Sequence, residues 1–411
     1  HYKNTDGIFA NRVIHIFEDR SGNIWLSSIL GIRIFTGHQF GYHSLATGLA
    51  YNWIYSVFQS TKGTYYFGTW GKGSSQLDEK SGDLLEPVPG LSGQKVTAIV
   101  DDERNRVWFG TTDNGIFVQN EGKLRPITED DGLPSKRILS MYRDSRNRIW
   151  VGTTKGIGIF QSGKLVKSLK KEDGLPILFI TAILEDTEKN MWFGSLGGAI
   201  RYDGDSFFLY SSKNGLANDF VSGIYLDRNG DLWIGGKNKV SILGKGGISI
   251  KEAECGVIYG FYRDRSKRMW VAGRSGVGYF QGDRFIKIRI KDGIIATEVN
   301  QGAIFADSSA RLWLGTNRGV MWIDTGQVPD LIDSPQVYLK NITVDRIPVA
   351  GKGNRFKAHQ NSIAFRFGAI SFASLGDVRY RYILHGLPNG DWQTTDQTFV
   401  EFHHLPSGNF K

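Results

Sequence analysis

The sequence predicts an all-β protein, with a β-propeller of four-stranded blades followed by a small Ig-like β-sandwich. A frame of strand, tight turn, strand and tight turn occurs eight times, and each copy carries one large aromatic residue: Trp25, Tyr66, Trp108, Trp150, Trp192, Trp233, Trp270 and Trp313. These residues are separated by 41, 42, 42, 42, 41, 37 and 43 positions. A regular period of this length, made of short strands, indicates propeller blades. Glycine is abundant, at 52 of 411 residues, as the many turns of such blades require.

The fourth copy shows how one blade is built. We expect four antiparallel strands, at residues 138–142, 148–153, 156–161 and 164–169. Trp150 alternates with Ile149 and Val151 in the second strand, so both faces of this strand need to be covered by neighbouring blades. The repeated tryptophan is therefore expected to pack between blades rather than to contact a ligand.

The number of blades in the ring is open. Eight copies favour eight blades, and a seven-bladed ring with one blade left over is the alternative. The outer strand that ends each copy, such as residues 206–210, is missing after the eighth copy. His1 and Tyr2 stand where the end of such a strand belongs, so we expect the N-terminus to complete the last blade.

A different pattern follows the repeats. Residues 337–344, 362–367 and 378–384 alternate apolar and polar side chains, as antiparallel strands do, and turns are expected at residues 386–390 and 406–408. We therefore predict two domains, a propeller over residues 1–330 and a β-sandwich over residues 334–411. The sandwich is expected to be incomplete at its C-terminal end.

Composition narrows the class of protein only slightly. The formal net charge of +9 favours an acidic partner or reflects a generally basic surface. The single cysteine, Cys255, excludes an internal disulfide and fits either the cytoplasm or the periplasm. No apolar run approaches the roughly 18 residues that a membrane helix needs.

No catalytic or metal-binding pattern stands out in the sequence. Gly156 and Gly158 lack the third glycine of a nucleotide-binding loop, since Gln161 stands in its place. His403 and His404 are adjacent in a predicted strand, so they point to opposite faces and do not suit one metal ion. We expect no enzyme activity, no metal and no cofactor. Nucleic acid is disfavoured because no basic stripe with regular aromatic spacing follows any strand.

Candidate binding residues come from one face of the predicted propeller. The segment that leads into each first strand and the loop that joins the second and third strands share this face, and loops on rigid scaffolds are where binding residues concentrate. Unlike the repeated tryptophan, the residue just before each first strand varies in type. We expect a ligand site at the mouth of the channel, formed by Arg12, Trp53, Lys95, Arg137, Phe179 and Phe220 from the lead-in segments and by Trp70, Lys237 and Arg274 from the loops. Basic and aromatic side chains suit an acidic, partly apolar ligand such as a uronic-acid or sulfated oligosaccharide. A solvated basic rim is the alternative.

The repeat frame resembles a known family. Gly-Leu, a hydrophobic strand, Asp-x-x-Gly-x-(Ile/Leu)-Trp-(Ile/Val/Phe)-Gly-Thr and a following Gly-(Ile/Val) are similar to the two-component regulator propeller repeat, and residues 227–235 match it best. Tyr66 in place of tryptophan and Ala272-Gly273 in place of Gly-Thr depart from it. The tail resembles the triple-tyrosine domain that follows such propellers, through Tyr380, Tyr382, Leu384, Gly386, Leu387, Asp391, Trp392 and the turn Leu405-Pro406-Ser407-Gly408. Phe410 stands where that domain usually has a tyrosine.

The resemblance implies the ligand-sensing ectodomain of a membrane-bound signalling protein, usually a histidine kinase, located in the periplasm of an inner-membrane protein. In such proteins a membrane helix and a cytoplasmic output module would follow the sandwich, and the full-length protein is expected to form a homodimer. Many relatives carry fourteen repeats in two seven-bladed rings and respond to oligosaccharides. The alternative function is a scaffold propeller that mediates protein–protein interaction.

Overall fold

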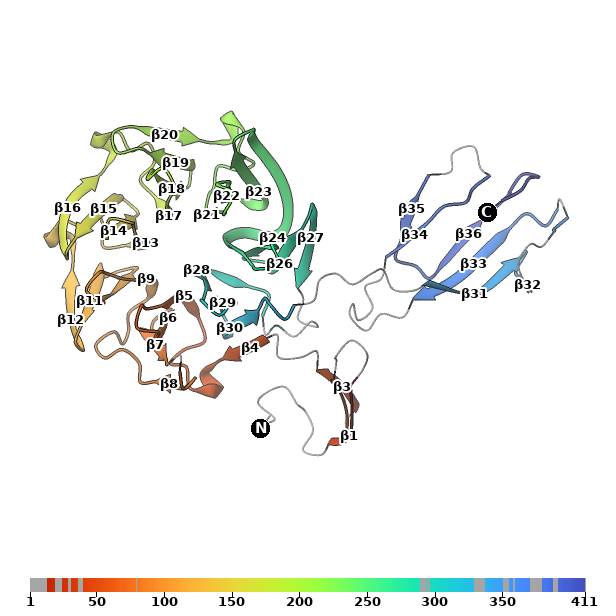
Figure 1. Cartoon of the computed structure of the whole chain (residues 1–411), viewed down its shortest axis with the longest axis horizontal. Coiled ribbons are helices and arrows are strands. Elements are labelled where there is room, and N and C mark those ends of the chain that lie inside the picture. Colours follow the sequence, from red (N-terminus) through yellow and green to blue (C-terminus); the bar gives the residue numbers. More distant parts are fainter. Residues whose placement is uncertain are drawn as a thin grey trace. The chain divides into compact units, whose positions relative to one another are not determined.

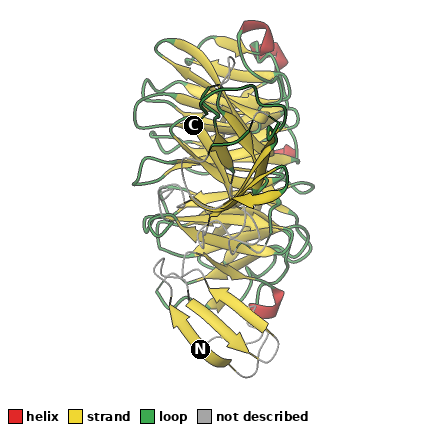
Figure 2. Cartoon of the chain, turned by 90° about the vertical axis from the view of Figure 1, so that its right-hand side faces the viewer, coloured by secondary structure: helices red, strands yellow, loops and turns green. Residues whose placement is uncertain are grey.

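The computed structural model describes residues 13–18, 24–28, 31–35, 40–78, 80–288, 294, 296–328, 337–349, 355–357, 359–369, 379–386 and 391–410. Every regular element in these ranges is a β-strand or a one-turn 3-10 helix (Figure 2). None of the helices in the described ranges has the length and hydropathy to cross a membrane. Contacts divide the chain into two units, one of His1–Ile14 and Ser27–Val328 and the other of His15–Leu26 and Pro329–Lys411.

The first unit contains a ring of four-stranded blades (Figure 1). In each blade the first strand is innermost and the later strands follow outward. Four blades consist of β5 (Ile54–Gln59), β6 (Tyr65–Thr69), β7 (Ser74–Leu77) and β8 (Leu84–Leu85); β9 (Val96–Asp101), β10 (Val107–Thr111), β11 (Ile116–Asn120) and β12 (Lys123–Ile127); β13 (Ile138–Arg143), β14 (Ile149–Thr153), β15 (Gly156–Gln161) and β16 (Lys164–Leu169); and β17 (Ile180–Glu185), β18 (Met191–Ser195), β19 (Gly198–Tyr202) and β20 (Phe207–Tyr210).

The next two blades share one long strand. β21 (Gly223–Leu226), β22 (Leu232–Gly235) and β23 (Lys237–Gly244) pair with the first half of β24 (Gly247–Arg263), and its second half is the inner strand before β25 (Met269–Gly273), β26 (Gly276–Gln281) and β27 (Arg284–Ile288). The last blade consists of β28 (Val299–Ala306), β29 (Arg311–Thr316) and β30 (Gly319–Asp324), with β4 (Phe40–His43) as its outer strand.

The described strands form seven blades rather than the expected eight. β4 ends the first repeat, yet it pairs with β30 of the last repeat and closes the ring there (Figure 1). The inner strand β28 contacts β5 on one side and β24 on the other, so the circle is complete without the rest of the first repeat. An N-terminal strand does complete the last blade, but it comes from residues 40–43. His1 and Tyr2, to which that role was assigned from the sequence, lie outside the described residues.

The other strands of the first repeat form a sheet of their own. β1 (Val13–Glu18), β2 (Ile24–Ser28) and β3 (Gly31–Phe35) pair in this order and with no other described strand. Ile14, Ile16 and Phe17 in β1 are each more than half exposed. Without a fourth strand, this repeat is the blade left over in the alternative prediction.

Within the ring, the repeated aromatic residue packs between blades, as predicted. Trp150 is 1% exposed, and its ring lies 5.9 Å from that of Phe193 and 6.4 Å from that of Tyr202, both in the next blade. A Cβ atom on Gly152 would lie 2.8 Å from Cγ2 of Ile180, so only glycine lets the next blade approach this closely. All five residues of β14 are buried, as expected of a strand covered on both faces.

The other constant residues of the repeat shape its turns. The hydroxyl of Thr153 donates to the carbonyl oxygen of Gly156 at 2.8 Å and accepts from the backbone N–H of Lys155 at 3.0 Å, which fixes the turn between the second and third strands. Gly174, with φ of 88°, ends a 3-10 turn in the left-handed conformation that favours glycine, and Leu175 after it is buried. This turn is η4 (Lys171–Asp173), and it recurs at η2 (Leu45–Thr47), η3 (Glu129–Asp131) and η5 (Ser212–Asn214).

The C-terminal part of the chain contains two further sheets. One has the order β32 (Ile347–Val349), β31 (Val337–Val344), β33 (Ile363–Ala369) and β36 (Phe399–Phe402), and the other pairs β34 (Tyr380–Tyr382) with β35 (Gln393–Thr395). The strands expected at residues 337–344, 362–367 and 378–384 coincide with or overlap β31, β33 and β34. Phe367, Tyr380 and Val400 form a small buried core here.

Candidate ligand-binding site

The loops of the ring divide onto two faces. Because neighbouring strands are antiparallel, the lead-in segments and the loops between second and third strands lie at one end of the blades. Backbone hydrogen bonds join the two sets, as from the N–H of Trp70 to the carbonyl of Trp53 at 3.0 Å and from Gly115 to Lys136 at 2.9 Å. We call this end the mouth face, and we call the opposite end, which carries the Asp-x-x-Gly turns, the turn face.

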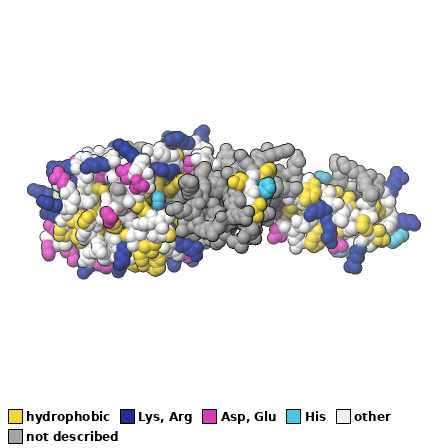
Figure 3. Space-filling view, turned by 90° about the horizontal axis from the view of Figure 1, so that it is seen from below, with side chains coloured by type: hydrophobic (Ala, Val, Ile, Leu, Met, Phe, Trp, Pro, Cys, Tyr) yellow, Lys and Arg dark blue, Asp and Glu magenta, His cyan; other side chains and the backbone are white. Residues whose placement is uncertain are grey.

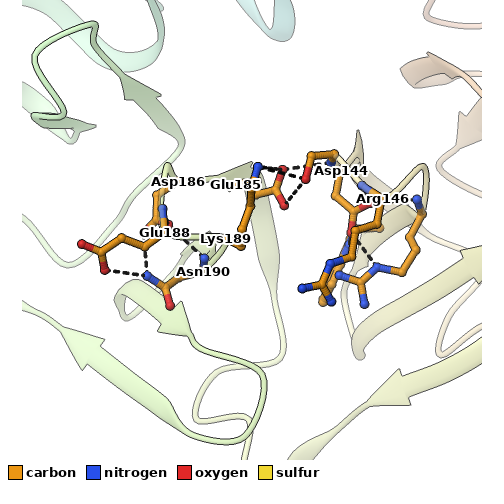
Figure 4. Close-up of polar contacts among 10 residues, drawn as sticks. Asp144, Arg146, Glu185, Asp186, Glu188, Lys189 and Asn190 are labelled. Atoms are coloured by element: carbon orange, nitrogen blue, oxygen red, sulfur yellow. Dashed lines mark hydrogen bonds and ion pairs between the residues drawn. The ribbon is translucent and has the colours of Figure 1, made fainter.

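On the turn face, polar groups of neighbouring blades bind one another. The backbone N–H and the hydroxyl of Ser145 both donate to the carboxylate of Glu185 at 2.9 Å, and Nζ of Lys189 lies 3.1 Å from the Ser145 hydroxyl (Figure 4). Arg143 and Asp101 form a similar contact between blades, with 3.0 Å from Nη1 to Oδ1. These groups hold the ring together, whereas the nearby Arg146 side chain is exposed.

A channel runs between the inner strands, where a cavity of about 180 Å³ is lined by residues of all seven blades. Its wall contains a belt of polar side chains that donate to the backbone of the next blade. The donors and accepting carbonyls are Ser56 to Val96, Thr97 to Ile138, Ser140 to Ile180, Thr181 to Val221, Ser222 to Ile258 and Asn300 to Ile54. We call these six side chains the polar belt. Each donor of the belt is already hydrogen-bonded to a backbone carbonyl of the next blade. The main role of the belt is therefore to join the blades.

The structure places the sequence-predicted site residues that it describes on the mouth face. Arg12 lies outside the described residues. Trp53 is 45% exposed. The other side chains are exposed at Arg137, Lys237 and Arg274 and partly buried at Trp70, Lys95, Phe179 and Phe220.

Three of these residues come together around Asp113. Nζ of Lys95 lies 5.1 Å from the ring centroid of Trp70 and 3.2 Å from Oδ2 of Asp113. The pKa of Asp113 is lowered, chiefly by the hydrogen bond from the Thr112 hydroxyl and further by the positive charges of Lys95 and Arg137. Trp70, Lys95 and Arg137 therefore belong to one cluster, in which part of the positive charge is already compensated.

Sequence reasoning missed two tyrosines at the inner rim of the mouth face. Tyr55 and Tyr259 each follow the leading apolar residue of an inner strand, and the ring of Tyr55 lies 4.5 Å from that of Trp70. Burial raises the pKa of both phenols, and the positive charge of Arg274 opposes this rise at each of them. Arg274 is thus close to both rings. The sequence could have indicated them, because the residue type at this position varies from blade to blade. Around the ring the position is occupied by Tyr55, Thr97, Leu139, Thr181, Ser222, Tyr259 and Asn300.

The aromatic residues Phe179 and Phe220 stand in a different part of the mouth face. They lead into the two adjoining blades that begin with β17 and β21, where Leu196 is 52% exposed. The structure places both side chains on the expected face, but their blades are not those of Trp70 and Lys95. The mouth face therefore has an apolar part and a part rich in cations and tyrosines, with Lys237 as a cation near the apolar part.

Positive charge alone does not single out this face. Seen edge-on, the ring carries Lys and Arg side chains along both its upper and lower edges, with Asp and Glu among them (Figure 3). What distinguishes the mouth face is that cations are combined with aromatic rings at the end of a channel. Over the described ranges, no group of three or more His, Cys, Asp or Glu residues is arranged to hold a metal ion.

Comparison with known proteins agrees with this architecture. Residues 7–29, 90–113, 132–155, 174–197 and 215–238 match the family described as two component regulator propeller. A search with the sequence matched no curated protein. The extracellular domain of BT3049 from B. thetaiotaomicron, assigned to a hybrid two-component system, is 20% identical and superposes with a TM-score of 0.76, over 97% of this chain and 58% of that one.

Two other solved structures are similar at lower scores. The extracellular domain of BT4673 from B. thetaiotaomicron is 17% identical, with a TM-score of 0.58 over 97% of this chain and 60% of its own. Virginiamycin B lyase from Staphylococcus aureus is 16% identical, with a TM-score of 0.56 over 69% of this chain and 98% of its own. At such identities the likeness concerns the fold, which sensors and enzymes share. Five segments of this chain thus match the two-component regulator propeller repeat; four of them lie in the ring, and the fifth covers residues 7–29.

Proposed function

We propose that this chain is the extracytoplasmic ligand-sensing part of a membrane-bound two-component signalling protein, and that it binds an acidic oligosaccharide at the mouth face. The observation that carries the proposal is the combination of two-component regulator propeller repeats with a cluster of cations and aromatic rings at the channel mouth. The repeats support the sensing role, and the cluster supports the class of ligand.

The chemistry of the mouth face suits such a ligand in two ways. Guanidinium and ammonium groups of Arg137, Arg274 and Lys237 are exposed and can form charge-assisted hydrogen bonds to carboxylate or sulfate. The exposed ring of Trp53 and the partly buried ring of Trp70 offer flat apolar surfaces on which a sugar ring can stack. Neither interaction requires a deep pocket.

In this proposal the chain itself is not an enzyme and uses no metal or cofactor. The C-terminal sheets correspond to a triple-tyrosine domain, which relays ligand binding to a histidine kinase output module beyond a membrane helix. The location is the periplasm, and the full-length protein is a homodimer whose two ectodomains reorient when ligand binds. These features rest on the family resemblance rather than on any contact described above.

Calorimetric titration tests the ligand class. Oligogalacturonides and sulfated galactan oligosaccharides are compared with neutral galacto-oligosaccharides of the same length, at two salt concentrations. We expect acidic glycans to bind more tightly and to lose affinity as salt is added, because a rim site is incompletely shielded from solvent. Equal or stronger binding of the neutral glycans would contradict the proposal.

A pair of arginine variants tests whether the ligand binds on the mouth face. Arg137→Ala removes a mouth-face cation and should weaken binding about ten- to a hundredfold, the usual cost of one lost charge-assisted hydrogen bond. Arg146→Ala removes an exposed cation from the turn face and should leave affinity within about twofold. Equal losses in both variants would show that binding follows overall charge and not this face.

A further inference from the structure

Two phenols and one guanidinium at the inner rim of the mouth face lack side-chain partners. Tyr55, Tyr259 and Arg274 form no side-chain hydrogen bond and no ion pair with any described part of the chain. Tyr259 lines the channel cavity, Tyr55 packs on Trp70, and the positive charge of Arg274 acts on both phenols. Polar groups that stand near a cavity and have no partners of their own are suited to bind a ligand.

The fold itself does not need Arg274. In its blade the backbone N–H of this residue donates to the carbonyl of Val257 at 2.8 Å. The same bond is made by Trp70 and by Thr112 in other blades, at 3.0 and 3.1 Å. Since the backbone closes this turn whatever the side chain is, the guanidinium is free to serve another purpose.

The two tyrosines are equally unnecessary for joining the blades. At their position in the inner strands, Thr97, Thr181, Ser222 and Asn300 belong to the polar belt and donate to a neighbouring carbonyl. Tyr55 and Tyr259 make no such bond. In the blade of Tyr55 the hydroxyl of Ser56, one residue later, takes over the contact.

We infer that Tyr55, Tyr259 and Arg274 form an anionic subsite, which binds the carboxylate or sulfate group of an acidic sugar above the channel. This inference rests on the proposed function and names the residues that recognise the charge. Two phenol O–H groups and a planar guanidinium supply donors for all oxygens of such a group, and the guanidinium can engage two of them at once. Trp70, which packs on Tyr55, then lies beside the sugar ring that carries the charge.

The two acidic groups considered on this face, Asp113 and Glu298, have partners other than Arg274. Asp113, which belongs to the cluster of Trp70 and Lys95, forms an ion pair with Lys95. Glu298, which leads into the blade between those of Tyr259 and Tyr55, accepts a hydrogen bond from Nδ2 of Asn317 at 3.1 Å. Neither carboxylate forms an ion pair with Arg274, so the guanidinium is available for a ligand.

The test uses the whole chain and the acidic oligosaccharides named above. Tyr259→Phe removes a single hydroxyl and should weaken binding about three- to tenfold, and Arg274→Gln should weaken it about ten- to a hundredfold. Both losses should vanish for neutral galacto-oligosaccharides. The matched control is Lys155→Gln, which removes an exposed mouth-face cation from the blade that begins with β13, a different blade from those of the phenols and Arg274, and should change affinity less than about twofold. Comparing the galacturonide and galactan arms tells whether carboxylate or sulfate is the preferred group.

The outcomes separate the two proposals. If Arg137→Ala weakens binding while Tyr259→Phe and Arg274→Gln bind as the unmodified protein does, the subsite is wrong and the proposed function stands. If no acidic glycan binds the unmodified protein, both are wrong. Equal losses in Arg274→Gln and Lys155→Gln would also overturn the subsite, because any mouth-face cation would then serve.

A measurement without ligand checks the geometry. Because the charge of Arg274 opposes the burial that raises the pKa of Tyr55 and Tyr259, Arg274→Gln should raise the pKa of both phenols further. Ultraviolet titration of tyrosine ionisation, with Tyr259→Phe and the double variant for assignment, would record this. An unchanged titration would show that Arg274 does not lie against the phenols, and the subsite would fail.

Discussion

The indole nitrogen of Trp150 donates a hydrogen bond to Oδ2 of Asp144, 2.8 Å away, and the two residues are 1% and 3% exposed. The same carboxylate accepts Nε of Arg148 at 2.6 Å, and its other oxygen accepts the backbone N–H groups of Arg146 and Arg148 at 2.9 and 2.8 Å. One side chain thus closes the turn and holds the aromatic residue that packs against the next blade. The bond recurs from Trp108 to Asp102, Trp192 to Asp186, Trp233 to Asp227, Trp270 to Asp264 and Trp313 to Asp307.

Trp150→Ala should destabilise the propeller by about 3–5 kcal/mol, the usual cost of emptying a buried aromatic site. The matched control is Trp53→Ala, because Trp53 is 45% exposed and its loss should change the free energy of unfolding by no more than about 0.5 kcal/mol. Urea denaturation followed by tryptophan fluorescence measures both. Similar midpoints for the two variants would contradict the packing between blades.

Asp144→Asn should make stability less dependent on acidic pH. Burial by itself disfavours the charged carboxylate, but hydrogen bonds from Trp150 and from the backbone and side chain of Arg148 outweigh it, so the pKa of Asp144 is lowered. A lowered pKa in the folded state means that the ionised group stabilises the fold above its unfolded pKa of about 3.9. This contribution is lost as the pH falls through the folded pKa.

The variant should therefore be less stable than the unmodified protein at pH 7, by about 1–3 kcal/mol, and the difference should shrink below about pH 4. Urea unfolding at a series of pH values records the two stability curves. Curves that run parallel from neutral to acidic pH would show that the charge of Asp144 has no such role.

Gly41→Ala should weaken the closure of the ring. A Cβ atom at this position in β4 would lie 2.2 Å from Cζ2 of Trp322 in β30, so the indole or the strand must move. Overpacking of this kind costs about 1–3 kcal/mol. Gly246→Ala is the control, because no atom lies within 4 Å of a Cβ there. Thermal unfolding that is lowered equally in both variants would mean that the contact between β4 and β30 does not limit stability.

The single blade was predictable because its signals are local. The strands of the fourth repeat, the turn at Asp144 and the burial of Trp150 all follow from spacing and alternation within about twenty residues. The pairing partner of residues 40–43 was not predictable in this way. The outer strands have similar sequences in every repeat, so the sequence does not show which sheet each one joins. Whether β4 pairs with its own repeat or with the last one depends on contacts between residues almost 300 positions apart, such as Met321 with Tyr42.

The candidate site was likewise predictable only in part from the sequence. Variation before each first strand was enough to place Trp53, Arg137 and their equivalents on one face. It did not reveal Tyr55 and Tyr259, because each follows the leading apolar residue of its inner strand, at a register shift that the sequence does not show. Nor did it separate the blades of Phe179 and Phe220 from the cluster around Trp70, since that requires the order of blades around the closed ring.

Ser222→Ala tests whether the polar belt joins the blades. The Ser222 hydroxyl donates to the carbonyl oxygen of Ile258 in the next inner strand at 2.7 Å, and the residue is 3% exposed. Without this donor the carbonyl loses a partner in a place with little water, which costs about 1–3 kcal/mol. Ser249→Ala, in the outer strand of the same blade, removes an exposed hydroxyl and should change stability by no more than about 0.5 kcal/mol.

Urea denaturation measures the stability of both variants, and amide hydrogen exchange in β21 and β24 reports on the junction between the two blades. We expect faster exchange at this junction in Ser222→Ala alone. If its stability and exchange match those of Ser249→Ala, the blades are joined by apolar packing and the belt contributes nothing.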